Sequence, residues 1–155
     1  MAFRSNPNAK LMACVLALDI GAKRTGLAIS DENQIFAFPH DTVETRGLTL
    51  RIQKISQSYP LAGLVVGIPM NLKNEPTDNT CRVQSLIVVL HKAFPSIPIF
   101  GVDERFTSRI AQQAMVAGGM KKKERQIKEN TDKLSATLIL QSYLEQKKHL
   151  KPLFS

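Results

Sequence analysis

Acidic residues stand at three separate places in the chain from which they can act together. Asp19 ends one apolar run, Asp103 and Glu104 follow another, and Asp132 lies in a segment with a helical pattern. Carboxylates brought within a few ångströms repel one another, and a cation relieves that repulsion. Oxygen ligands suit Mg²⁺ or Mn²⁺, and two such ions about 4 Å apart can drive phosphodiester hydrolysis.

The first elements that would position these acids form an antiparallel meander. A nearly continuous apolar run predicts a buried strand over residues 12–20. Two further apolar segments, 27–30 and 35–38, predict a second and a third strand, the last one ended by Pro39. Short polar turns separate the three segments, which favours antiparallel pairing between successive strands.

Helices and strands then alternate along the chain. Each predicted helix lies between predicted strands, so the later strands should run parallel to the first one. The fold class is therefore predicted to be α/β, with a five-stranded mixed sheet in which the antiparallel meander is followed by parallel βαβ units with helices on the faces of the sheet. The elements are a helix over 48–59, a strand over 64–68, a helix over 83–94, a strand over 97–102, a short helix after Thr107 or Ser108, a basic mobile loop around 120–130 and a last helix from Thr131 to about 147.

Length and composition limit the classes of protein that fit. The 155 residues predict a polar lead-in over 1–11, one domain over 12–148 and a short tail over 149–155. No apolar stretch approaches the roughly 20 residues of a membrane span. Cys14 and Cys81 lie far apart, without the spacing of a zinc site, so we expect a reducing compartment and hence the cytoplasm.

The charge balance favours a polyanionic partner. Lysine and arginine total 21 against 13 acidic residues, a net charge of +8. Clustered cations gain affinity for nucleic acid by releasing counterions from its phosphates. Two cations lie in a turn between Gly21 and Gly26, and others lie between the acids in the sequence. The predicted nucleic-acid contacts are Lys23, Arg24, Arg105, Lys121, Lys122, Lys123, Arg125 and Lys128.

The predicted topology gathers the acids at one edge of the sheet, because parallel strands end there together. We therefore predict that Asp19, one of Asp103 and Glu104, and Asp132 are the catalytic residues and bind two ions of Mg²⁺ or Mn²⁺. Each acid alone has a structural explanation: a turn cap, an ion pair with Arg105, or a favourable charge at a helix N-terminus. The residues leave open whether Asp103 or Glu104 is the ligand.

Four segments together resemble the signature blocks of the YqgF/RuvX family. They are Leu18 to Gly26, Val66 to Asn71, Asp103 to Ser108 and Asp132 to Leu144, and the similarity extends from about 13 to 147. The resemblance implies a ribonuclease H-like fold and a divalent-metal nuclease. It also implies that the first-strand acid is Asp19, that the second is Glu104 in preference to Asp103, and that the helix acid is Asp132. Ser135-Ala136-Thr137 replaces the two alanines that are usual there, and this change touches no acid.

The resemblance leaves the substrate open. It implies either processing of the 5′ end of precursor 16S ribosomal RNA or resolution of Holliday junctions in DNA. A junction resolvase cuts two symmetric strands and normally needs two active sites. No exposed apolar stripe is evident in the sequence, so we expect a monomer and favour RNA. Alternatives are a sugar-kinase-like phosphate loop, which would need a second domain, and a nucleic-acid-binding assembly factor without catalysis.

Overall fold

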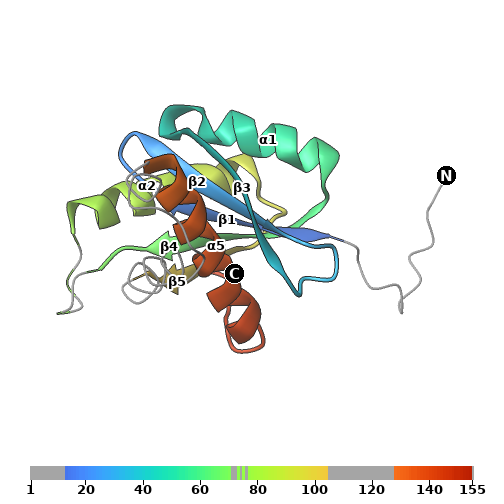
Figure 1. Cartoon of the computed structure of the whole chain (residues 1–155). Coiled ribbons are helices and arrows are strands. Elements are labelled where there is room, and N and C mark those ends of the chain that lie inside the picture. The colour runs from blue at the N-terminus through green and yellow to red at the C-terminus, as the bar shows by residue number, and fades with distance from the viewer. Residues whose placement is uncertain (1–12, 71–72, 74, 76, 105–127, 155) are drawn as a thin grey trace.

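The fold is a five-stranded sheet with helices on both faces, described here from a computed structural model (Figure 1). The structure describes residues 13–70, 73, 75, 77–104 and 128–154, with side chains from 133 onward in the last segment. The strands are β1 (Cys14–Ile20), β2 (Arg24–Ser30), β3 (Ala37–Glu44), β4 (Leu61–Ile68) and β5 (Ile99–Asp103), in the spatial order β3-β2-β1-β4-β5. The helical elements are η1 (Thr45–Gly47), α1 (Leu48–Ser58), α2 (Asp78–Ala93) and α5 (Lys128–Gln146).

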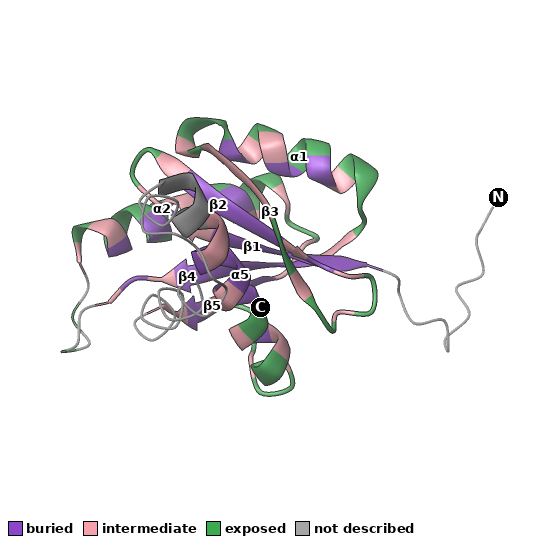
Figure 2. Cartoon of the chain, in the orientation of Figure 1, coloured by how far each residue is buried: buried purple, intermediate pink, exposed green. Residues whose placement is uncertain are grey.

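The strand directions match the sequence prediction. β1 pairs antiparallel with β2, and β2 pairs antiparallel with β3. β4 runs parallel to β1, and β5 runs parallel to β4. The central strand β1 is buried on both faces, which explains why its sequence is nearly continuous in apolar residues. Figure 2 shows buried residues concentrated in the central strands and on the inward sides of the helices.

One face of the sheet carries a core that is closed by α1 and α2. Leu16 and Leu18 of β1 pack in it together with Ile52 of α1 and Leu90 of α2. The helix periodicity correctly predicted this inward face for both helices. The Thr77 and Thr80 side chains form a capping box at the start of α2, and the Thr80 hydroxyl also donates to the Pro69 carbonyl. These bonds fix the start of α2 to the loop after β4.

The other face carries a second core, closed by α5. Val15 and Ala17 of β1 pack there with Ile139 and Tyr143 of α5. Helix α5 crosses this face over β1, β2 and β3, opposite the side on which α1 lies (Figure 1). In β4 and β5, and in β1 from Val15 onward, alternation sorts the residues between the two cores, so these positions can be assigned to the α1/α2 face or to the α5 face.

Several predicted boundaries were wrong, and three of them affect the assignment of residues. The third strand does not end at Pro39 but continues to Glu44, because β3 lies at the edge of the sheet, where proline is tolerated, and the register shifts beside it. Helix α5 begins at Lys128 rather than Thr131, so Lys128 belongs to a helix and not to a loop. Tyr59 is 45% exposed and lies beyond the end of α1, so it is not part of the buried helix face.

The last residues of the described chain lie along the edge strand β5. The Leu153 amide donates to the Ile99 carbonyl at 2.8 Å. The Phe154 ring stacks on His91 of α2, with ring centroids 3.9 Å apart. These contacts cover a strand edge that would otherwise expose unpaired backbone groups. Among the helices in the described ranges, none is long and apolar enough to cross a membrane.

Candidate active site

The register of β1 places Asp19 on the α5 face of the sheet. Asp19 pairs with Gly26 of β2 and lies two residues beyond Ala17, which belongs to the α5 core. Successive side chains of a strand point to opposite faces, so Ala17 and Asp19 share one face. Asp19 is the first residue of this face that is only half-buried, because the strand reaches its carboxyl end there.

The same alternation separates Glu104 from Asp103. Val102 lies in the α5 core, and Glu104 follows it by two residues, so Glu104 shares the face of Asp19. Asp103 pairs with Ile68, which packs against the core on the opposite face. The Glu104 amide donates to the Ile68 carbonyl at 3.3 Å, which holds the residue at the end of the strand.

Asp19 and Glu104 meet directly. Their side chains come within hydrogen-bonding range, Asp19 from β1 and Glu104 from the position directly after β5. Burial raises the pKa of Glu104 above its usual value, the bond from Asp19 lowers it, and the charge of Asp103 raises it further. Two carboxylates this close repel each other. A cation between them would relieve that repulsion, and carboxylate oxygens are suitable ligands for a hard divalent ion.

Gly67 of β4 makes room for the Glu104 carboxyl. A Cβ atom built on Gly67 would lie 2.7 Å from Glu104 Oε2 and 2.5 Å from Ile139 Cδ1. Both distances are far below ordinary carbon contacts of about 3.5–4.0 Å. Gly67 thus lets the carboxyl lie against the backbone of β4, between the strand and α5. The sequence placed Gly67 in a signature block but did not reveal this role, for which the spacing of the strands was needed.

The turn after β1 is fixed by backbone and side-chain hydrogen bonds. The Gly21 amide donates to the Arg24 carbonyl at 2.9 Å, and a Cβ on Gly21 would lie 2.6 Å from that oxygen. The Thr45 hydroxyl donates to the Gly21 carbonyl at 2.8 Å. Asn79 of α2 donates to the Ile20 carbonyl at 3.3 Å. The turn next to Asp19 is therefore held from both η1 and α2.

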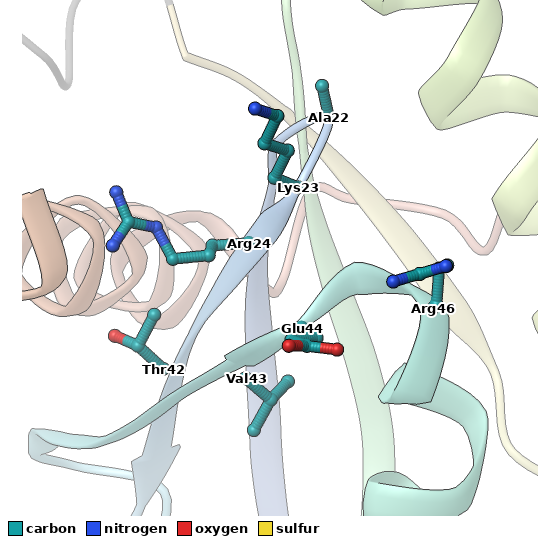
Figure 3. Close-up of a pocket in the computed structure, with 7 residues that line it drawn as sticks. All are labelled: Ala22, Lys23, Arg24, Thr42, Val43, Glu44 and Arg46. Atoms are coloured by element: carbon teal, nitrogen blue, oxygen red, sulfur yellow. The ribbon is translucent and has the colours of Figure 1, made fainter.

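A cavity of about 670 Å³ opens beside this turn (Figure 3). Its lining includes two predicted nucleic-acid contacts, Lys23 and Arg24, together with Thr42, Glu44 and Arg46. Arg24 pairs with Glu44 across β2 and β3, so both lie on the α5 face, as Thr42 does. Arg46 was not predicted from the sequence, because it follows a strand that the pattern ended too early.

The remaining predicted residues are placed only in part. Asp132 lies in α5, seven residues and about two helical turns before Ile139, so both positions fall on one side of the helix. The side chains of Asp132 and Lys128 lie outside the described residues, and so do Arg105, Lys121, Lys122, Lys123 and Arg125. Within the described ranges, no group of three histidines, cysteines or acids is close enough to hold a metal ion. The described part of the site is the pair Asp19 and Glu104.

The fold of the chain is similar to that of solved nucleases. The structure resembles RuvC of Thermus thermophilus in complex with a Holliday junction substrate, with a TM-score of 0.58 over 91% of this chain and 99% of RuvC, at 16% identity. A second structure of the same RuvC matches with a TM-score of 0.56 at 15% identity. The fold is therefore ribonuclease H-like, as the resemblance of the sequence blocks implied.

The chain belongs to the RuvX family. The family model, described as Holliday junction resolvase, matches residues 13–146. A protein of Phocaeicola vulgatus is 45% identical over 90% of this chain and 100% of its own length. One of Bacteroides thetaiotaomicron is 41% identical over 88% of this chain and 99% of its own length. Both carry the name "Putative pre-16S rRNA nuclease".

Proposed function

We propose that this chain is a divalent-metal-dependent nuclease that processes the 5′ end of precursor 16S ribosomal RNA. The observation that carries the proposal is the contact between Asp19 and Glu104, two carboxyl groups from different strands at the carboxyl edge of the sheet. Membership of a family whose members are named nucleases supports the reaction class. The names of the relatives in Phocaeicola and Bacteroides support RNA as the substrate.

The roles of the residues follow from their positions. Asp19 and Glu104 would hold the metal ions, and Asp132 would complete the ligand set from α5. Mg²⁺ or Mn²⁺ held there would supply activation of a water nucleophile and stabilisation of the leaving oxygen of a phosphodiester. The chain itself contributes a rigid frame: Gly67 admits the Glu104 carboxyl, and the bonds of Thr45 and Asn79 fix the turn that follows Asp19. Rigid support of this kind keeps the ligands at a fixed spacing.

Substrate affinity would come from basic residues around the acids. Lys23 and Arg24 line a cavity next to the turn after Asp19. Arg105 follows Glu104 directly in the sequence, and the cluster from Lys121 to Lys128 lies between Glu104 and Asp132. Contacts from such cations to phosphates position a nucleic acid without reading its bases. The cleavage position would then depend on the shape of the RNA rather than on its sequence.

The test compares two substrates with matched variants. Precursor 16S RNA with its 5′ extension and a synthetic four-way DNA junction are incubated with the protein in Mn²⁺, Mg²⁺ or EDTA. Wild type should shorten the RNA only with metal. Asp19→Asn and Glu104→Gln should lower the rate by orders of magnitude. Glu145→Gln removes the same charge from an exposed position near the carboxyl end of α5 and should keep the wild-type rate.

The outcomes separate the candidate functions. Equal rates for wild type and Asp19→Asn from equally pure preparations would refute the assignment of the metal ligands. Cleavage of the junction without cleavage of the RNA would favour the second candidate, a Holliday junction resolvase, which the description of the family model supports. Tight RNA binding without cleavage in either metal would indicate a binding protein that assists ribosome assembly.

A further inference from the structure

The cavity beside the glycine turn is bordered by more cations than anions. Among the described lining residues, Lys23, Arg24 and Arg46 are cations and Glu44 is the one carboxylate, so their net charge is about +2. Among the described residues, none makes an ion pair or a side-chain hydrogen bond with Lys23, Arg24 or Arg46. Their charges are available to a ligand, and a cluster of like charges gains most from an anionic one.

Arg46 is held beside the turn by its neighbour Thr45. The Thr45 amide donates to the Lys23 carbonyl at 2.9 Å, and its hydroxyl donates to the Gly21 carbonyl at 2.8 Å. The same hydroxyl lies 3.0 Å from the buried Thr25 hydroxyl. These bonds join η1 to the β1–β2 turn, so the backbone positions of Arg46 and Lys23 are fixed relative to each other although they are far apart in the sequence.

The cavity lies on the β3 side of the acidic pair. Asp19 pairs with Gly26 of β2, and Gly26 pairs with Thr42 of β3, which lines the cavity. Two strand spacings of about 4.8 Å place Thr42 roughly 10 Å from Asp19 across the sheet. A nucleic acid held at the acids has further phosphates within this distance, because the phosphates of one strand are only a few ångströms apart.

We propose that this cavity is a phosphate-binding subsite that holds the nucleic-acid backbone next to the scissile bond, and that Arg46 is its principal unassigned contact. The proposal rests on the proposed function, since it takes nucleic acid as the ligand. It adds a direction: the bound strand extends from the acids toward β3. Thr45 acts as a positioning residue, because its bonds hold Arg46 next to Lys23.

Two substitutions should change affinity in opposite directions. The probe is a fluorescein-labelled 20-nucleotide RNA of mixed sequence, and binding is measured by anisotropy in EDTA between 50 and 200 mM salt. Arg46→Ala should reduce the salt slope by about 0.7 and the affinity about eightfold at 50 mM and about threefold at 200 mM, the contribution of one phosphate contact to a single strand. Glu44→Gln should raise affinity about two- to threefold, because it removes a like charge several ångströms from a phosphate.

The controls separate a subsite from general charge effects. Lys92→Ala removes an exposed cation from the last turn of α2, away from the carboxyl edge, and should leave the affinity unchanged. Thr45→Val keeps the size of the side chain but removes its hydroxyl bonds, so Arg46→Ala should cost less affinity in that background than in wild type. A merely structural role of Thr45 would leave the cost of Arg46→Ala unchanged.

Failure of the subsite is distinguishable from failure of the nuclease proposal. If wild type cleaves RNA but Arg46→Ala binds with the wild-type affinity and slope, the subsite is refuted alone. Weaker binding by Glu44→Gln would refute it as well, because loss of an anion should help an anionic ligand. If Arg46→Ala and Glu44→Gln shift affinity as expected while wild type cleaves nothing, the subsite stands and the nuclease proposal fails.

Discussion

The substitution Gly67→Ala tests how the Glu104 carboxyl is held. The added Cβ would lie 2.5 Å from Ile139 Cδ1 and 2.7 Å from Glu104 Oε2, about 1 Å inside ordinary contact distances. The Ile139 methyl can move by rotation of its own side chain. The Glu104 carboxyl lies at the end of its strand and must move away from β4, which changes its position relative to Asp19.

The expected energy follows from these overlaps. Overpacking a core by one methyl group costs about 1–3 kcal/mol, and replacing glycine by alanine returns about 0.4–1 kcal/mol through the unfolded chain. The net loss in free energy of unfolding should be about 1–2 kcal/mol, or roughly 2–8 °C in Tm for a domain of this size. Most of the protein stays folded, yet metal-dependent cleavage should fall by orders of magnitude because the carboxyl that we propose as a metal ligand is displaced.

Two further variants make the test specific. Gly63→Ala changes the same strand on the same face, but its Cβ would meet Phe100 Cε2 at 3.3 Å, so stability should change by less than about 1 kcal/mol and cleavage should persist. Adding Ile139→Val to Gly67→Ala removes the closer contact and should restore part of the stability but none of the cleavage. Full cleavage by folded Gly67→Ala would refute the reasoning, since the carboxyl would not need its place against β4.

Three other variants test the frame of the site. Burial raises the pKa of Glu104 in the folded state above its value in the unfolded chain. The free energy of unfolding therefore falls as pH rises from the unfolded pKa through the folded pKa, where folded Glu104 loses its proton. Glu104→Gln should therefore be more stable than wild type at neutral pH in EDTA, and denaturant titrations should show the difference vanishing near pH 4; a constant difference would contradict this. Gly21→Ala should lower Tm, because its Cβ would lie 2.6 Å from the Arg24 carbonyl oxygen, and an unchanged Tm would mean that the turn relaxes freely. Truncation after residue 149 should cost about 1–3 kcal/mol in urea denaturation and promote aggregation through the uncovered edge of β5, whereas a fully soluble and equally stable protein would show that the tail does not protect it.

Much of the fold was predictable because its signals are local. The run over β1 indicated a strand buried on both faces, and the alternation of helices and strands required β4 and β5 to be parallel to it. The prediction failed for β3, where Pro39 was interpreted as a strand end. Only the position of β3 at the sheet edge makes that proline acceptable, and edge position is a property of the whole sheet.

The expectation of a monomer rested on a weaker signal. The sequence shows no regular apolar stripe, yet the structure exposes Ile35 and Phe36 by 60% and 62% in the β2–β3 turn and Phe38 by 50% in β3. Gln34 in the same turn has a positive φ of 56°. Exposed apolar residues divided between a turn and an edge strand have no single periodicity, and sequence patterns therefore do not detect them.

Strand alternation decides between Asp103 and Glu104, and it predicts which of the two acids is needed for cleavage. Glu104 shares the α5 face with Asp19, whereas Asp103 pairs with Ile68 on the opposite face. Glu104→Gln should therefore abolish metal-dependent cleavage. Asp103→Asn should leave cleavage within about tenfold of wild type, because it only removes a charge that raises the pKa of Glu104. That removal lowers the pKa of Glu104, so the acidic limb of the pH–rate profile of Asp103→Asn should move to lower pH. A greater loss from Asp103→Asn than from Glu104→Gln would reverse the assignment, and it would mean that the end of β5 twists away from the alternation of the sheet.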